Sequence, residues 1–215
     1  MRLFILAGML WWTCRACGRI RREPQRYARY AWFLSLTIYA AMLVQEGVLL
    51  RAGLLTWANG LPLHLCSLLG LLTPLTLLTR SRMLRSAAFF LGIPGAALAL
   101  IFPAVLHTPW PRLTAAAFHT LHAGLFCAPW LARARGWRPV PADALRAGVF
   151  LVMAAALAMV VNPLTGGNYL FLAAPVPGTP LAWLGQWGIW PYRGLLAACA
   201  AFLLLLEAGL LCVRR

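Results

Sequence analysis

The sequence predicts an all-α protein, a bundle of helices that crosses a membrane several times. Two observations lead to this fold class. Of the 215 residues, 62% are hydrophobic and only 11% are charged, whereas charged residues make up roughly a quarter of a soluble domain. Apolar runs of the length that a helix needs to cross a bilayer also recur along the chain, about 20 residues each. A soluble fold could not bury this much apolar surface.

Six apolar segments meet or approach the spanning length, and together they form one predicted helical domain over residues 1–215. Their ranges are 30–50, 61–79, 87–106, 113–131, 144–161 and 194–213. A seventh segment, 3–12, is too short to span alone, and no small-residue cleavage site of a signal peptide follows it. We therefore expect six full spans and a short or truncated first helix.

The arginines predict the orientation of the bundle, because positively charged loops stay in the cytoplasm. All 19 basic residues are arginine, and 15 of them fall in alternate loops or at the carboxyl terminus. The remaining loops and the amino terminus hold only Arg2, Arg51, Arg112 and Arg193. This count places the amino terminus outside the cytoplasm and the carboxyl terminus inside.

Residues 162–193 form a predicted external loop that is rich in Gly, Pro and Trp. Irregular backbone is costly to insert in lipid, so this segment is expected outside the hydrocarbon core. Trp183, Trp187 and Trp190 suit the membrane interface. The segment is therefore either an interfacial loop held by aromatic side chains or a lid over a site.

The net charge of +15 indicates attraction to anionic lipid rather than nucleic acid, because the arginines lie between membrane segments. The six cysteines are scattered and do not resemble a disulfide framework. Cys14 and Cys17 supply only half of a zinc site, and no metal-binding spacing of the HExxH type occurs. No cofactor, no metal and no nucleic-acid partner is therefore expected, and the sequence does not indicate an oligomeric state.

Ionisable residues inside a membrane span are costly, so each is a candidate for function. Five of them fall in the outer half of three predicted spans, and these are Glu46, His64, Cys66, His119 and His122. Cysteine attacks as the thiolate and needs a neighbouring base, which an imidazole provides.

The spacing of these residues suggests which of them act together. His119 and His122 are three residues apart and share a helix face, whereas His64 and Cys66 would lie about 200° apart on a regular helix. We therefore pair Cys66 with a histidine of the other helix, and Glu46 could orient that histidine. The alternatives are that Cys66 packs as a small hydrophobe, that each histidine bonds a backbone carbonyl, and that Glu46 faces the interface.

Two sequence blocks carry a resemblance to a known family. They are Leu-Pro-Leu-His-Leu-Cys at 61–66 and Asn-Pro-Leu-Thr-Gly-Gly-Asn-Tyr-Leu-Phe-Leu at 162–172, with Thr-Arg-Ser-Arg at 79–82 and His122 between them. With these blocks the chain resembles the YwaF-type family of bacterial integral membrane proteins. That family is distantly similar to a vertebrate multi-span phospholipid acyltransferase that depends on a cysteine and a histidine. The chain has Ser67 where the family commonly has an acidic residue.

The resemblance implies a lipid acyltransferase or transacylase in a bacterial inner (cytoplasmic) membrane, with membrane phospholipids as partners. Cys66 would accept the acyl group and His122 would act as base, with His119 and Glu46 as further catalytic candidates. The substrate-binding candidates are His64, Asn168 and Tyr169. A small-molecule transporter and a non-enzymatic membrane assembly protein are the alternative functions.

Overall fold

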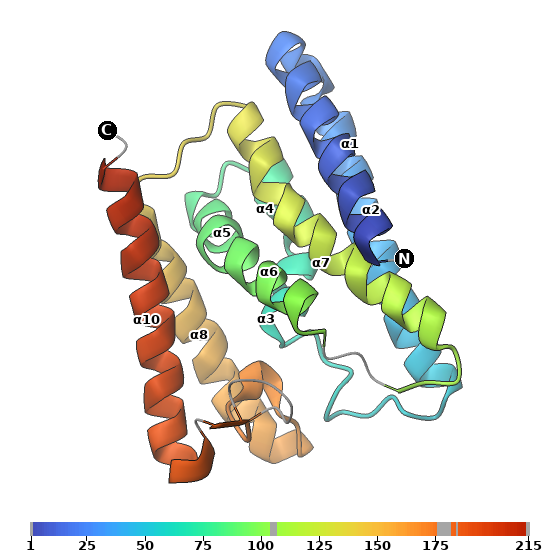
Figure 1. Ribbon diagram of the computed structural model, residues 1–215, viewed down its shortest axis with the longest axis vertical. Coiled ribbons are helices and arrows are strands. Elements are labelled where there is room, and N and C mark those ends of the chain that lie inside the picture. Colours follow the sequence, from blue (N-terminus) through green and yellow to red (C-terminus); the bar gives the residue numbers. More distant parts are fainter. Residues whose placement is uncertain (1, 104–106, 176–181, 184, 214–215) are drawn as a thin grey trace.

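The computed structural model describes residues 2–103, 107–175, 182–183 and 185–213, and the described chain is helical without strands (Figure 1). The long helices are α1 (Arg2–Arg22), α2 (Tyr27–Arg51), α7 (Pro111–Ala134), α8 (Ala142–Thr165) and α10 (Ile189–Val213). The short helices are α3 (Leu65–Leu71), α4 (Thr73–Leu78), α5 (Arg82–Ala87) and α6 (Ile93–Ile101). Single turns complete the described elements: η1 (Pro24–Arg26), the π-helical turn η2 (Ala88–Gly92), η3 (Tyr169–Phe171) and η4 (Gly185–Trp187). The prediction of an all-helical membrane protein is confirmed.

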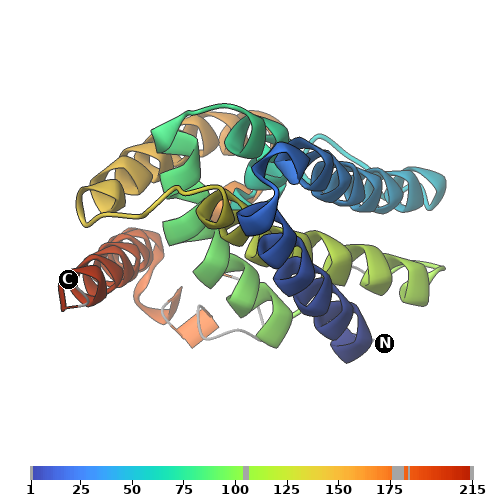
Figure 2. The same ribbon diagram turned by 90° about the horizontal axis from the view of Figure 1, so that it is seen from above.

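Helix α7 occupies the middle of the bundle. It packs against α1 and α2 on one side and against α6 on the other, while α5 packs against α8, and α8 against α10. Seen from the two directions of Figures 1 and 2, α1 and α2 form one edge of the bundle, and α8 and α10 form the opposite edge. The short helices α3 to α6 lie between these edges, so the core is centred on α7.

The chain alternates between two ends of the bundle (Figure 1). One end carries the arginine-rich segments around η1, before α5 and between α7 and α8, and we call it the arginine-rich end. The segments that follow α2, α6 and α8 lie at the other end, the arginine-poor end. The connectivity thus separates the arginines as the loop count predicts, and the side of the membrane that each end faces stays a prediction.

Within the described residues, four stretches are long and apolar enough to cross a membrane: Pro24–Arg51, Arg82–Ile101, Ala142–Thr165 and Ile189–Cys212. The last of them buries none of its most apolar window inside the protein, and large side chains such as Leu145, Phe202 and Leu205 are exposed. Such faces are unfavourable in water and suited to lipid. Helices α1 and α7 are not among these four, so the six predicted spans stay a prediction.

Three predicted segments differ from the observed helices. Segment 3–12 is part of α1, which continues to Arg22, because arginine favours helix and keeps its charge in water beyond the apolar run. Segment 61–79 is divided: its helical part begins only at Leu65, and Pro74, which has no N–H to donate, lies in the first turn of α4. Within segment 87–106, the π-helical turn η2 precedes Pro94, and residues 104–106 lie outside the described residues.

Ile38 of α2 joins three helices at the centre of the bundle. Its side chain is fully buried. A Cβ added to Gly124 of α7 would lie 2.6 Å from the Cγ1 of Ile38, and one added to Gly70 of α3 would lie 3.4 Å from its Cγ2. Both glycines therefore allow close approach, and the short helix α3 contacts α2 and α7 at this level.

Asp143 holds α8 to α5 at the arginine-rich end. Its fully buried carboxylate accepts two hydrogen bonds from Arg82, one to each oxygen at 2.8 Å, and one from Arg146 at 2.8 Å. The backbone N–H of Val140 donates a further bond at 3.0 Å. A buried carboxylate with this many charged donors is well satisfied.

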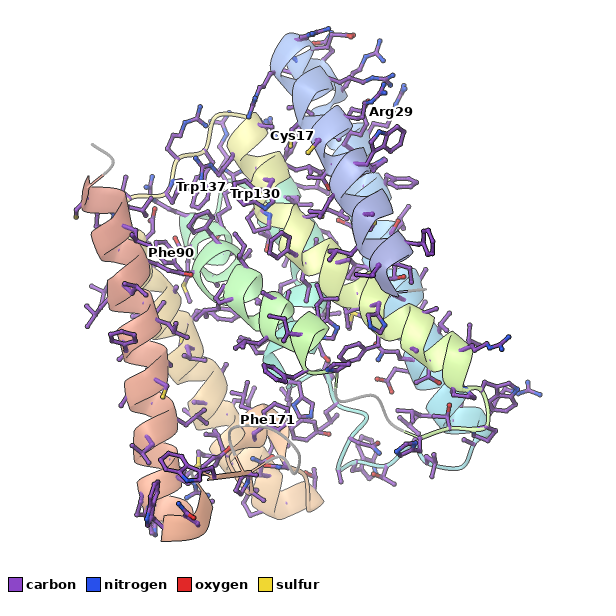
Figure 3. All side chains as sticks on the ribbon, viewed as in Figure 1. Cys17, Arg29, Phe90, Trp130, Trp137 and Phe171 are labelled. Atoms are coloured by element: carbon purple, nitrogen blue, oxygen red, sulfur yellow. The ribbon has the colours of Figure 1, made fainter. Side chains whose placement is uncertain are left out.

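On the other side of the bundle, the Cys17 thiol of α1 contacts the carbonyl oxygen of Trp130 in α7 at 3.4 Å (Figure 3).

We predict that Gly124→Ala destabilises the bundle, because the new methyl group would lie 2.6 Å from the Cγ1 of Ile38, which is fully buried. The expected loss in the free energy of unfolding is about 1–3 kcal/mol, measured by thermal unfolding in detergent. Gly47→Ala is the matched control, since a Cβ there meets nothing within 4 Å. An equal effect of the two substitutions would contradict the close contact.

Candidate active site

Cys66 lies in the first turn of α3, the helix that follows the segment after α2. His64, two residues before Cys66, has extended backbone (φ −68°, ψ 146°), so it lies outside the helix. Cys66 is a free thiol, half-buried, and it packs against the core. Its side chain is therefore held in place without being closed off from its surroundings.

The contacts of Gly70 define which face of α3 carries Cys66. A Cβ at Gly70 would lie 3.0 Å from the Sδ of Met42 in α2 and 3.1 Å from the Cδ1 of Leu121 in α7. Cys66 precedes Gly70 by four residues and therefore shares its helix face, about 6 Å along the axis. Cys66 is thus directed toward the space between α2 and α7. Leu121, which borders this space, precedes His122 in the sequence of α7.

The two predicted histidines are buried in α7, with 5% of His119 and 6% of His122 exposed. The Nδ1 atom of His122 lies 2.7 Å from the carbonyl oxygen of Phe118, and that of His119 lies 2.5 Å from the carbonyl oxygen of Ala115. A carbonyl oxygen only accepts, so in both rings Nδ1 carries the proton and donates it. With the proton on Nδ1, the neutral form of either ring has its lone pair on Nε2, as a general base requires.

The two histidine rings differ in their surroundings. The ring of His122 packs on that of Phe118, with 4.1 Å between their centroids. The Nε2 atom of His119 is buried and has no hydrogen-bond partner among the described residues. A buried nitrogen without a partner is costly, and a catalytic role is one explanation for such an atom.

Glu46 lies on α2, one helical turn from Met42 toward the arginine-poor end, and is half-buried. Met42 contacts the position of Gly70, so Glu46 lies at about the level of Cys66. Glu46 makes no hydrogen bond or ion pair with the part of the chain that the structure describes. Each histidine Nδ1 already donates to a backbone carbonyl. Glu46 therefore does not orient either ring through a hydrogen bond to Nδ1.

Tyr169 connects the two sequence blocks that carry the resemblance. It is fully buried, and its hydroxyl donates a hydrogen bond to the carbonyl oxygen of Trp57 at 2.7 Å and accepts one from the N–H of Leu61 at 3.0 Å. Its ring also packs on that of His64, with centroids 5.2 Å apart. Tyr169 therefore fixes the segment that leads into α3 and Cys66.

His64 lies between two aromatic rings of this loop. Besides Tyr169, the ring of Phe171 packs on it at 5.2 Å between centroids. Leu170 and Phe171 both have positive φ, 55° and 58°, a conformation that non-glycine residues rarely adopt. Figure 3 labels Phe171 at the arginine-poor end, opposite to Cys17 and Trp130. The strained turn presents Phe171 to the residue that precedes α3.

The loop owes its shape to two asparagines. Asn162 at the end of α8 accepts from the N–H of Tyr169 at 2.7 Å and donates to its carbonyl oxygen at 3.1 Å. Asn168 accepts from the N–H groups of Ala173 and Ala174 at 2.9 and 3.0 Å. Of the three predicted substrate-binding residues, His64 and Tyr169 are in contact, and the Asn168 side chain is engaged within its own loop.

Sequence reasoning did not single out Asn162 and Phe171 as site residues. Asn162 is a polar side chain at the end of an apolar span and directly before a proline, which is a signal for a residue that satisfies backbone groups there. Phe171 has no comparable signal, because its role depends on the positive φ angles of the turn. Among the described residues, no three side chains of His, Cys, Asp or Glu form a metal site.

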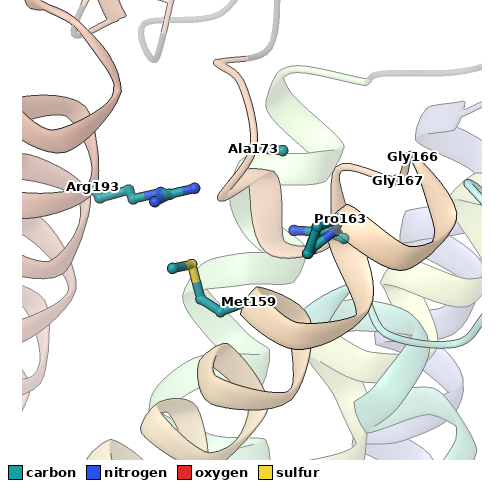
Figure 4. A pocket seen from close by; sticks show the side chains of 7 residues that line it. Met159, Pro163, Gly166, Gly167, Ala173 and Arg193 are labelled. Atoms are coloured by element: carbon teal, nitrogen blue, oxygen red, sulfur yellow. The ribbon is translucent and has the colours of Figure 1, made fainter.

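Two open pockets lie at the arginine-poor end, and neither is lined by Cys66 or His122. One of about 370 Å³ is bounded by Trp110, Arg112 and Leu113. The other, of about 350 Å³, lies between the end of α8 and the start of α10 and includes Arg193 (Figure 4). The side chain of Cys66 is partly exposed, and it lies outside both of these pockets.

We predict that Tyr169→Phe destabilises the protein, because two hydrogen bonds of the buried hydroxyl are lost. The expected decrease in unfolding free energy is about 1–3 kcal/mol, measured by thermal unfolding in detergent. Tyr30→Phe is the control, since that hydroxyl makes only a 3.5 Å contact with Arg19 at the surface. Equal stability of Tyr169→Phe and wild type would show that the loop does not hold the segment before α3.

Comparison with known protein families shows which family the sequence matches. The model of the TMEM164 family, a family of membrane proteins, matches residues 1–206. No curated protein and no solved structure matches the chain.

Proposed function

The chain belongs to the TMEM164 family, and we propose that it is a membrane-embedded acyltransferase or transacylase that acts on phospholipids. In this proposal Cys66 accepts the acyl group and His122 is the general base. The observation that carries it is the hydrogen bond from His122 Nδ1 to the carbonyl oxygen of Phe118, which leaves the lone pair of Nε2 free to take a proton.

The packing of α3 on α7 supports the pairing of these two residues. A Cβ at Gly70 would lie 3.1 Å from the Cδ1 of Leu121 in α7. Because Cys66 shares a helix face with Gly70, this contact supports the pairing. Cys66 is separated from that contact by one helical turn, about 6 Å along the axis. His119 lies one turn before His122 on the same helix, and its unpartnered Nε2 makes it the second candidate for the base.

The proposed reaction has two balanced halves. The Cys66 thiol gives its proton to His122 Nε2, the thiolate attacks the ester carbonyl carbon of a phospholipid, and the ester C–O bond breaks. The leaving alkoxide takes the proton from His122 and departs as a lysophospholipid, which leaves a Cys66 thioester. The hydroxyl of an acceptor lysolipid then attacks the thioester while its proton passes to His122. The departing thiolate recovers that proton, and both side chains return to their starting forms.

The loop 168–172 supports the same proposal through its contacts with the segment that precedes Cys66. Tyr169 and Phe171 pack on His64, and Tyr169 bonds to Leu61, so the loop holds the chain just before the nucleophile. His64, Asn168 and Tyr169 are therefore proposed to shape the substrate site, with Asn168 acting through the turn that it stabilises. Glu46, at the level of Cys66, is proposed to assist the histidines through charge.

The proposal also includes a place in the cell. The resemblance to a bacterial family and the separation of the arginines favour the inner (cytoplasmic) membrane of a bacterium, with the arginine-rich end in the cytoplasm. Cys66 and the loop 168–172 would then face the outer leaflet, whose phospholipids would be the substrates. The exposed apolar faces of α8 and α10 suit contact with that lipid.

We predict that the purified protein, given a radiolabelled phospholipid, forms a hydroxylamine-sensitive thioester at Cys66. Cys66→Ala would abolish the label, because no thiol remains to accept the acyl group, and His122→Asn would slow labelling about 10²–10⁴-fold, as expected for loss of a general base.

The matched controls are Cys199→Ala, an exposed cysteine of α10, and His107→Asn, an exposed histidine outside the helices. Both should label like wild type. Unchanged labelling of Cys66→Ala, or no labelling of a well-folded wild type with any phospholipid class, would count against the acyltransferase and favour a transport or assembly role.

A further inference from the structure

Arg193 is the single charged residue between Arg146 and Glu207, a stretch of otherwise apolar and neutral sequence. It lies in the first turns of α10, at the arginine-poor end. Its Nε atom donates a hydrogen bond to the carbonyl oxygen of Leu172 at 2.8 Å, and its guanidinium lies 4.9 Å from the ring centroid of Trp190. One side of the guanidinium is thus held by the loop, and its position is fixed.

The rest of this guanidinium borders the pocket between α8 and α10. Figure 4 shows the Arg193 side chain extending from α10 toward Ala173 and Pro163, with Met159 below it. The pocket of about 350 Å³ falls at the lower end of the range for small-ligand sites, about 300–1,000 Å³. No acidic side chain lines it, so the charge of Arg193 is not neutralised within the pocket.

The pocket also has a negative end. Gly166 ends α8 with φ 68°, and Pro163, Gly166 and Gly167 border the pocket, so the carboxyl-terminal turn of α8 lies beside it. The carboxyl end of a helix carries a partial negative charge that favours a cation. A ligand that carries both an anion for Arg193 and a cation for the end of α8 would satisfy both charges.

We propose that this pocket binds the head group of a zwitterionic phospholipid, with the phosphate on Arg193 and the ammonium group at the carbonyl end of α8. Arginine suits phosphate because its remaining N–H groups can donate to two phosphate oxygens. The exposed Trp183, Trp187 and Trp190 surround the start of α10 and belong to the side chains typical of the head-group region of a bilayer.

This binding site does not depend on the proposed transfer reaction, because a phospholipid could occupy it in a protein without catalysis. The two are linked only by the loop. Leu172, which accepts from Arg193, follows Phe171, which packs on His64 two residues before Cys66. A head group on Arg193 would therefore lie beside the loop that holds the segment before the nucleophile.

Binding is measured by native mass spectrometry of the full chain in a maltoside detergent, which contains no phosphate. The probe is dihexanoylphosphatidylcholine below its micellar concentration. Dihexanoylglycerol lacks the phosphate, dihexanoylphosphatidylglycerol lacks the ammonium group, and phosphocholine lacks the acyl chains. These three compounds separate the contributions of the head group and of the lipid tails.

The variants are Arg193→Gln, Arg193→Lys and Ala173→Trp, which fills the pocket and leaves Arg193 in place. Arg51→Gln is the matched control, an exposed arginine at the same end of the bundle that borders neither described pocket. Thermal unfolding of each variant verifies that it is folded. Since Arg193 also holds Leu172, Ala173→Trp tests the pocket without removing that bond.

We expect dihexanoylphosphatidylcholine to bind wild type and Arg51→Gln equally, and to lose about tenfold in affinity in Arg193→Gln and Ala173→Trp. Arg193→Lys should retain part of the affinity. Phosphocholine binding as tightly as the lipid would support the same phosphate site and assign it to a free head group. Equal binding of dihexanoylglycerol, equal binding of dihexanoylphosphatidylglycerol, or no effect of Arg193→Gln and Ala173→Trp would overturn the proposal.

Discussion

The contact of Ile38 with two glycines determines where the candidate active site lies. The side chain of Ile38 is closed in by Gly124 of α7 and Gly70 of α3, positions where a Cβ would meet Ile38 atoms at 2.6 and 3.4 Å. Because α3 has only seven residues, its position depends on this packing and not on its own hydrogen bonds. The contact places the face of α3 that carries Cys66 toward the space between α2 and α7. The chemistry that we propose depends on that placement.

Hydropathy was sufficient to predict α2, α7, α8 and α10, and insufficient for the full length of α1 and for the broken helices. The apolar runs of three predicted segments are continuous, and each lies within one helix: 30–50 in α2, 113–131 in α7 and 144–161 in α8. Each helix extends past its segment by a few residues. The region before Cys66 reads as apolar too, yet the chain there is not helical until Leu65. Its path is fixed by Tyr169, more than 100 residues away, and no local pattern reveals such a long-range contact.

The sequence predicts which residues are candidates for the site, and it reveals only part of their geometry. The cost of ionisable groups in a membrane singled out Cys66, His119 and His122. A triad-like role for Glu46 was the natural expectation, but the backbone of α7 supplies the acceptor at each Nδ1, one turn before each histidine. This is a property of histidine in a helix, and the sequence interpretation included it only as the alternative to catalysis. In the structure the same bond favours the tautomer that the proposed reaction requires.

The central claim is that His122 takes the proton of Cys66, and the alkylation rate of Cys66 tests it without any substrate. The chain would retain Cys66 while the other five cysteines are replaced by serine, and iodoacetamide labelling would be followed at pH 7 with and without His122→Asn. The account predicts that Cys66 reacts faster when His122 is present, because only the thiolate is alkylated rapidly. Equal rates in two folded proteins would contradict it, since His122 would then be a packing residue bonded to its own helix.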